Sequence, residues 1–177
     1  NLFIDMMYEM FGNEIYGEND TSMERVVVES CIKNRKKIAV AESCTGGLIG
    51  DRITNISGCS EIFTGGLIVY SNNSKVKVLG LDYEGLNEFG AVSKYTARKM
   101  AENVKTMFNS SFGLSVTGIA GPNGGTKDKP VGLVYIGLAS DKNTIVEKYN
   151  FGKDRVLNKI KTSQAALQIL RKGLLDE

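Results

Sequence analysis

A short glycine-rich stretch holds residue types that could carry out acyl transfer. Residues 39–50 read AVAESCTGGLIG, so an apolar run is followed at once by Glu42, Ser43, Cys44, Thr45 and two glycines. Hydroxyls, a thiol and paired glycines at a strand-to-helix junction can bring a nucleophile and free backbone N–H groups into one small volume. The stretch therefore predicts a site of nucleophilic attack. The alternative is that Ser43 or Thr45 only caps the helix that follows.

The composition restricts the base that could activate this nucleophile. The chain has 177 residues and no histidine, which excludes Ser-His and Cys-His pairs and the usual histidine-containing zinc sites. A buried lysine is the best remaining base, because loss of solvation favours its neutral amine. Lys75 is a candidate, since it follows Tyr70 at the start of a short predicted helix. The alternative for Lys75 is a solvated surface residue.

Two further stretches could bind an anionic ligand. Residues 117–132 read TGIAGPNGGTKDKPVG and directly follow an apolar strand. Glycines at the carboxyl end of a strand let the backbone approach an anion closely, with an ordinary ordered loop as the alternative. No Gly-Lys-Ser/Thr ending is present, which argues against a Walker loop. Arg155 and Lys159 lie one turn apart at the start of the last predicted helix. Cations at that end oppose the helix dipole, so their position favours binding of an anionic ligand there. The alternative is a solvated basic stripe.

The elements that must position these residues alternate along the chain. Helical periodicity and capping residues predict helices at 21–35, 46–56, 73–80, 93–109 and 155–172, the first capped by Thr21 with Glu24. Short apolar runs predict strands at 37–43, 61–70, 112–118, 131–139 and 144–151. This alternation predicts an α/β fold with a layered, mixed sheet, in which the last two strands pair antiparallel across a turn at 141–143.

Charge and hydropathy exclude several classes of partner. The 22 basic and 20 acidic residues give a net charge of +2, and no long run of one sign suggests a nucleic-acid groove or an anionic membrane patch. No apolar run reaches the ~18 residues that span a bilayer, and the acidic amino end is unlike a secretion signal. Three cysteines without metal-type spacing indicate reduced thiols. We therefore expect a cytoplasmic protein that binds no nucleic acid and no membrane.

Four motifs together resemble the C-terminal domain of the competence-damage-inducible protein CinA, the family of nicotinamide-mononucleotide amidohydrolases. They are AESCTGG, GCSEIFTGGLIVYSNNSKVKVLG, SVTGIAGPNGGT with PVGLVYIGLA, and FGKDR, in that order. The resemblance runs from about Ser22 to Leu175. It implies a three-layer α/β/α sandwich with a mixed, mostly parallel sheet, a homodimer, and neither metal nor other cofactor. It also implies hydrolysis of nicotinamide mononucleotide to nicotinate mononucleotide and ammonia.

The amino end resembles a different part of such proteins. MFGNEIYGEND is similar to the end of the connector that precedes this domain in two-domain CinA proteins, and the first residue is Asn rather than Met. We therefore expect residues 1–20 to be a connector segment and residues 21–177 to be the amidohydrolase domain, as an excised C-terminal piece. A non-catalytic pyridine-nucleotide-binding regulatory domain is the alternative function.

The resemblance assigns roles to individual residues. Ser43 would be the nucleophile, Lys75 the general base, and Tyr70 a neighbour that positions or relays the proton. The residues expected to hold the amide oxygen and line its pocket are Thr45, Gly46, Gly47 and Ser60. Those expected at the ribose-phosphate end are Thr117, Gly118, Ala120, Gly121 and Arg155. Lys159 stands where the family usually has a second arginine, which leaves the phosphate affinity open.

Overall fold

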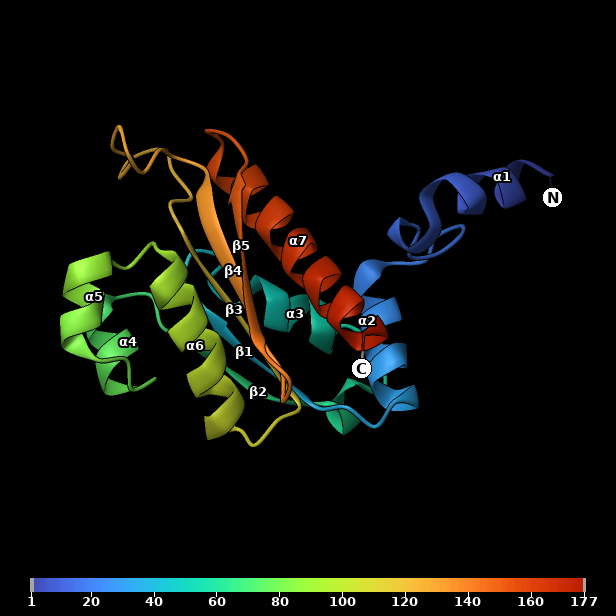
Figure 1. Ribbon diagram of the computed structural model, residues 1–177, viewed down its shortest axis with the longest axis horizontal. Coiled ribbons are helices and arrows are strands. Elements are labelled where there is room, and N and C mark those ends of the chain that lie inside the picture. Colours follow the sequence, from blue (N-terminus) through green and yellow to red (C-terminus); the bar gives the residue numbers. More distant parts are fainter. Residues whose placement is uncertain (1, 177) are drawn as a thin grey trace.

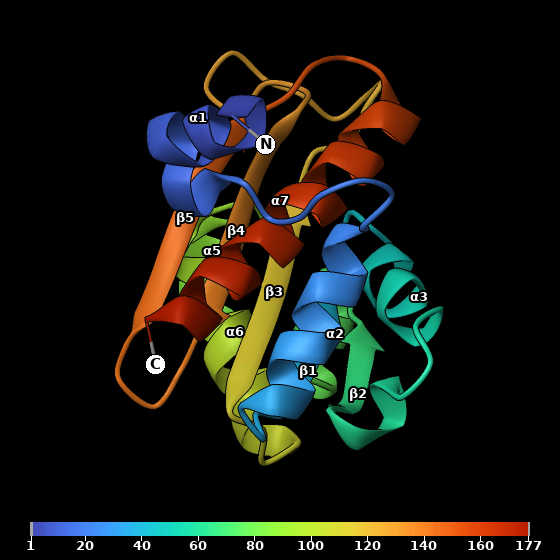
Figure 2. The same ribbon diagram turned by 90° about the vertical axis from the view of Figure 1, so that its right-hand side faces the viewer.

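The computed structural model describes residues 2–176 and shows a five-stranded sheet between two layers of helices (Figure 1). The strands are β1 (Ile38–Glu42), β2 (Phe63–Ile68), β3 (Phe112–Gly118), β4 (Leu133–Ala139) and β5 (Thr144–Asn150). Their order across the sheet is β2-β1-β3-β4-β5, which Figure 2 shows behind α2 and α7. The predicted three-layer α/β/α sandwich is confirmed.

Strand direction places the carboxyl ends of β1, β2, β3 and β5 at one edge of the sheet. β1 pairs in parallel with β2 and with β3, whereas β4 is antiparallel to both of its neighbours. Four strands thus run one way and only β4 runs the other way, so the mixed, mostly parallel sheet is confirmed. β4 and β5 pair from Leu133 with Asn150 to Ala139 with Thr144, as their short connection predicts. Residues that follow β1, β2 and β3 are therefore brought together.

One face of the sheet is covered by α2 (Met23–Lys33), α3 (Leu48–Thr54) and α7 (Arg155–Leu175). Because successive side chains of a strand point to opposite faces, Ile38 and Val40 of β1 point to this layer. The apolar cluster between this face and the three helices is the larger of the two within residues 2–176; it includes Val27, Cys31, Ile49, Ile53, Leu114, Val116, Ile136, Leu167 and Leu170. Burial of these side chains stabilises the layer.

The opposite face is covered by α4 (Asn72–Lys77), α5 (Tyr83–Phe89) and α6 (Lys94–Met107). The small side chains of Ala39 and Ala41 point to this layer and pack in a second cluster with Val69, Leu79, Leu81, Leu86, Met100 and Val104. Ser93 caps α6 by accepting a hydrogen bond from the Thr96 N–H, as its position predicts. None of the helices in residues 2–176 combines the length and the hydropathy that a membrane span needs.

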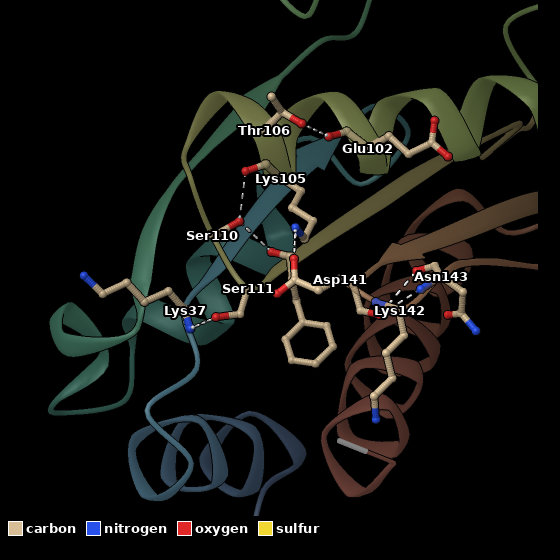
Figure 3. Close-up of polar contacts among 11 residues, drawn as sticks. Lys37, Glu102, Lys105, Thr106, Ser110, Ser111, Asp141, Lys142 and Asn143 are labelled. Atoms are coloured by element: carbon tan, nitrogen blue, oxygen red, sulfur yellow. Dashed lines mark hydrogen bonds and ion pairs between the residues drawn. The ribbon is translucent and has the colours of Figure 1, made fainter.

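Polar contacts tie the elements at the other end of the sheet (Figure 3). Lys105 of α6 lies 2.6 Å from the carboxylate of Asp141 in the β4–β5 turn. The Lys37 N–H, just before β1, donates to Ser111 Oγ at 3.0 Å, and Ser110 Oγ donates to the Phe112 carbonyl at 2.8 Å. These bonds satisfy backbone groups where β1 and β3 begin, so this end is occupied by structural contacts.

Two helices, α2 and α5, differ from the sequence prediction. The cap of α2 is Ser22, which accepts from the Arg25 N–H, whereas the Thr21 hydroxyl donates to the Glu18 carbonyl. The capping box of Thr21 with Glu24 is therefore wrong, because the helix begins one residue later. The helix α5 was not predicted, although its cap Asp82, which accepts from the Gly85 N–H, was an available signal.

The amino-terminal segment is also helical. α1 (Leu2–Phe11) and the 3₁₀ turn Gly12–Glu14 lie beside the sandwich rather than within it (Figure 1), and no residue of α1 is buried. The turn contacts α7: the Glu14 carboxylate lies 2.7 Å from Lys172 Nζ, and Arg171 donates to the Asn13 carbonyl. The role of residues 1–20 as a connector stays a prediction.

Candidate functional site

Ser43 and Lys75 meet inside the protein at the carboxyl end of β1. Ser43 is the first residue after the strand, and its N–H donates to the Val116 carbonyl of β3 at 3.1 Å. Lys75 lies on α4 and is only 1% exposed. Its Nζ is 3.0 Å from Ser43 Oγ, although 32 residues separate the two in the chain. The fold thus brings together the two residues predicted as nucleophile and base.

Burial makes the neutral amine of Lys75 easier to form than that of an exposed lysine. Its Nζ also lies 2.8 Å from the Val69 carbonyl oxygen and 3.1 Å from that of Tyr70. Burial lowers the pKa of the Lys75 ammonium to about 8. A neutral amine has two N–H groups, which the two carbonyls accept, and one lone pair, to which the Ser43 hydroxyl can donate. The pair can therefore move a proton from serine to lysine near neutral pH.

Two backbone features hold Lys75 in this position. Ser71 caps α4 by accepting a hydrogen bond from the Ser74 N–H at 3.0 Å. The Val69 N–H donates to the Glu42 carbonyl at 2.8 Å, which continues the pairing with β1 beyond the end of β2. The carbonyl groups that accept from Lys75 are thereby fixed relative to β1.

The turn after Ser43 offers fewer free donors than its glycines suggest. The Gly46 N–H donates to the Ser43 carbonyl at 3.2 Å, and the Gly47 N–H donates to Glu42 Oε2 at 3.0 Å. Both N–H groups are thus used within the chain, so they do not serve as free donors to an amide oxygen. These glycines instead adopt φ angles of 64° and 99°, which side-chain-bearing residues rarely do. Within residues 2–176, the N–H groups of Cys44 and Thr45 enter no backbone hydrogen bond in this turn.

Thr45 adds an unpaired hydroxyl to the site. The residue is fully buried, and its Oγ1 is the only buried side-chain polar atom in residues 2–176 without a hydrogen-bond partner. An unsatisfied buried hydroxyl costs about 1–3 kcal/mol. Such an atom beside a candidate nucleophile is a group that a bound ligand can satisfy.

Cys44 does not compete well with Ser43 for the role of nucleophile. It packs in the larger apolar cluster, and burial raises the pKa of its thiol to about 12. α3 begins only at Leu48, so no helix start lies at Cys44 to stabilise a thiolate, and desolvation dominates there.

Arg155 connects three segments at this edge of the sheet. It is the first residue of α7, and its guanidinium donates to the Gly121 carbonyl and to Tyr70 Oη, both at 2.8 Å. Tyr70 is 58% exposed and so lies at the surface of the site. Lys159, one turn further along α7, approaches the Ser43 turn: its Nζ is 3.9 Å from where a Cβ on Gly46 would lie.

The remaining residues predicted at the phosphate end have mixed positions. Gly121 contacts Arg155, and the Ala120 carbonyl accepts from Asn158 Nδ2 at 2.8 Å. Gly118 ends β3. The hydroxyl of Thr117 donates to the Ala91 carbonyl at 2.6 Å and is buried, so it is already satisfied. Asn158 was missed by sequence reasoning; its signal is a polar residue on the buried face of α7.

Ser60 lies apart from the other predicted site residues. It is exposed and belongs to the 3₁₀ turn Cys59–Glu61, which precedes β2. Since β2 is parallel to β1, Ser60 lies at the end of the sheet where β1 begins. Its predicted place in the pocket is therefore wrong for a single copy of this chain.

Glu42 is a further residue of this site, besides Asn158, to which neither its sequence pattern nor the family resemblance gives a role. It is the last residue of β1, it is 1% exposed, and its carboxylate accepts hydrogen bonds from three backbone N–H groups of Gly47, Ile49 and Gly50. The signal was an acidic residue at the end of an apolar run. Within residues 2–176, no group of three or more His, Cys, Asp or Glu side chains is placed to hold a metal ion.

Sequence comparison relates the chain to proteins from several bacteria. The family description that matches residues 20–174 is the CinA C-terminal domain. A competence-damage inducible protein of Caldicellulosiruptor bescii is 49% identical over 95% of this chain and 41% of its own length. A CinA-like protein of Kosmotoga olearia is 48% identical over 94% of this chain and 40% of its own length. The chain thus spans about two fifths of the length of these relatives.

Solved structures share the fold. The crystal structure of the competence/damage inducible protein CihA from Agrobacterium tumefaciens has a TM-score of 0.80 and 33% identity, covering 89% of this chain and 99% of that one. The competence damage-inducible protein A from Klebsiella pneumoniae has a TM-score of 0.83 and 25% identity, covering 86% of this chain and 95% of that one. The sandwich described above is therefore shared with these proteins.

Proposed function

The chain belongs to the CinA C-terminal domain family, and on that premise we propose that it is an amidohydrolase that converts nicotinamide mononucleotide to nicotinate mononucleotide and ammonia. The observation that carries the proposal is the buried pair of Ser43 and Lys75, with 3.0 Å between Oγ and Nζ. The lowered pKa of Lys75, about 8, gives the pair a base in a chain that has no histidine.

The proposed reaction has two steps. In the first, the neutral amine of Lys75 takes the proton of Ser43, and Ser43 Oγ attacks the carboxamide carbon. The carbon–nitrogen bond breaks, and the Lys75 ammonium returns its proton to the nitrogen, which leaves as ammonia. In the second, Lys75 takes a proton from water, which attacks the Ser43 ester. The acid product leaves, and Ser43 regains its proton.

Charge that develops on the amide oxygen needs donors near Ser43. The candidates are the N–H groups of Cys44 and Thr45, which donate to no backbone carbonyl in the turn, and the unpaired hydroxyl of Thr45. Each well-placed donor is worth roughly 3 kcal/mol in the transition state. We therefore assign the amide-binding role to the first half of the turn rather than to the N–H groups of Gly46 and Gly47.

The substrate phosphate would bind at the start of α7. Arg155 presents a planar, bidentate group there, and Lys159 adds a point charge one turn later. An anion near the first turn of α7 is also favoured by the helix dipole. The rest of the mononucleotide would lie between this anion site and Ser43.

A direct assay tests the proposal. Incubation with nicotinamide mononucleotide should release ammonia and an equal amount of nicotinate mononucleotide, while the Lys75→Met variant should release neither. Binding of the mononucleotide without any ammonia release by the wild-type chain would favour a non-catalytic pyridine-nucleotide-binding domain. A buried lysine with a lowered pKa argues for the enzyme, since ligand binding alone has no need of a base.

A further inference from the structure

The carboxylate of Glu42 takes the place of a helix cap for α3. The residue before α3 is Gly47, which has no side chain and forms no side-chain cap. Glu42 Oε2 accepts from the N–H groups of Gly47 and Ile49 at 3.0 and 3.1 Å, and Oε1 accepts from Gly50 at 2.8 Å. Three donors at the start of α3 are thus satisfied by one side chain that precedes the turn.

A carboxylate suits this position better than any other side chain. Its two oxygens only accept hydrogen bonds and offer about four lone pairs. Burial of its charge is offset by the three hydrogen bonds and by the positive end of the α3 dipole. A glutamine of the same size would present an NH₂ group to backbone N–H groups, so at least one donor would lose its partner.

These bonds restrain the turn that carries Ser43. A turn with two consecutive glycines at positive φ has much conformational freedom when nothing holds it. Glu42 and Gly47 flank the four residues 43–46. The 3.0 Å hydrogen bond from the Gly47 N–H to the Glu42 carboxylate therefore closes the turn across its base. The backbone around Ser43 is thus held at two places, by the bond from its own N–H to the Val116 carbonyl and by the closure of the turn at Glu42.

The backbone of the same residue reaches Lys75. The Glu42 carbonyl accepts from the Val69 N–H at 2.8 Å, and the Val69 carbonyl accepts from Lys75 Nζ at 2.8 Å. Glu42 is thus joined to Ser43 by the peptide bond, to the far end of the turn by its side chain, and to Lys75 through Val69.

We propose that Glu42 is a positioning residue that fixes the approach of Ser43 to Lys75 by holding the turn closed. The proposal rests on the proposed acyl-transfer function, and it requires no contact between Glu42 and the substrate. Small errors in the placement of reacting groups have large effects, since a misplacement of about 1 Å can slow a reaction roughly a hundredfold. Loss of the carboxylate should therefore lower kcat more than it raises KM.

The test compares Glu42→Gln with the control Glu24→Gln in the whole chain. Glu24 also contacts α3 through its carboxylate, which lies 2.7 Å from Arg52 Nη2. This contact lies outside the turn at residues 43–47. We expect Glu42→Gln to lower kcat for ammonia release about a hundredfold, with KM within about threefold of wild type. Glu24→Gln should lower the melting temperature and keep kcat within about twofold.

Two further readouts separate positioning from stability or charge. Hydrogen exchange of the Gly47, Ile49 and Gly50 amides should become faster in Glu42→Gln and stay slow in Glu24→Gln. The pH at which kcat reaches half its plateau should be unchanged in Glu42→Gln, because the role is geometric. Unchanged kcat with slow exchange would overturn the proposal. So would a shifted pH profile whose plateau equals that of wild type, since Glu42 would then act only through its charge.

Failure of the proposed function is distinguishable from failure of this inference. If wild type releases no ammonia, labelling of Ser43 by a fluorophosphonate measures its reactivity instead, and Glu42→Gln should slow it at least about tenfold. Equal labelling rates would overturn the inference. If Glu42→Gln does not fold, Glu42→Asp keeps the charge and shortens the reach by one methylene. Loss of reactivity in that variant supports positioning, and wild-type reactivity overturns it.

Discussion

The guanidinium of Arg155 donates a hydrogen bond to the hydroxyl of Tyr70 at 2.8 Å, across 85 residues of sequence. A second bond to the Gly121 carbonyl holds the same guanidinium beside the segment that follows β3. The Arg155 side chain, which is proposed to bind the substrate phosphate, is thus already held in place before the substrate binds. An incoming phosphate would compete with Tyr70 for the guanidinium, since charged acceptors form the stronger hydrogen bonds.

Arg155→Ala should weaken binding of the phosphorylated substrate selectively. Hydrogen bonds to charged groups contribute about 1.5–3 kcal/mol, so KM for nicotinamide mononucleotide should rise roughly tenfold to a hundredfold. KM for the phosphate-free riboside should change little. Lys161→Ala, on an exposed position of the same helix, is the control and should leave both values near wild type. Equal losses on the two substrates would place Arg155 in a structural role.

The rate should rise with pH as Lys75 loses its proton. Because burial lowers the pKa of Lys75 to about 8, the neutral base becomes the major form only above that pH, and kcat/KM should increase about tenfold per pH unit below it. Lys75→Arg should be inactive at every pH, since guanidinium stays charged. A rate that is constant from about pH 6 to 9, or an active Lys75→Arg variant, would exclude Lys75 as the base.

The same pKa predicts how stability changes with pH. Its value for Lys75 is about 8 in the folded chain, against an ordinary 10.5. Between these values the unfolded chain still binds the proton that the folded chain has lost, so the free energy of unfolding rises with pH. The free energy of unfolding of wild type, measured relative to that of Lys75→Met by urea unfolding, should therefore be roughly 3 kcal/mol higher at pH 10.5 than at pH 7. A difference independent of pH would mean that folding does not perturb Lys75.

Thr45→Val should separate stability from activity. The variant removes a buried hydroxyl that has no partner, so the free energy of unfolding should stay unchanged or rise by about 1–3 kcal/mol. Its kcat should fall about tenfold or more if the hydroxyl binds the amide in the transition state. Thr117→Val is the matched control, because its hydroxyl is bonded to Ala91, and it should be destabilised. A destabilised, fully active Thr45→Val would argue against a ligand-binding role.

The sequence was sufficient for most of the fold and for the central pair of the site. Alternating apolar runs and capping residues located β1, α6 and α7, and the motifs brought Ser43 and Lys75 into one site. The acceptance of backbone donors by Glu42 was not predictable, because nothing in AVAESCTGG shows that its carboxylate occupies the N–H of Gly47. The position of Ser60 also required the direction of β2, which pattern alone does not give. The first error concerns which acceptor a backbone donor meets, and the second concerns the end of the sheet at which a residue lies.

In the proposed reaction Ser43, and not its neighbour Cys44, attacks the amide with Lys75 as its base. The most direct test measures ammonia release from nicotinamide mononucleotide by wild type, Ser43→Ala and Cys44→Ala, with near-ultraviolet circular dichroism as the check on folding. We expect no release by Ser43→Ala and at least roughly a tenth of wild-type kcat/KM for Cys44→Ala, whose thiol has a pKa raised to about 12 by burial. An active Ser43→Ala beside a folded but inactive Cys44→Ala would exclude Ser43 as the nucleophile.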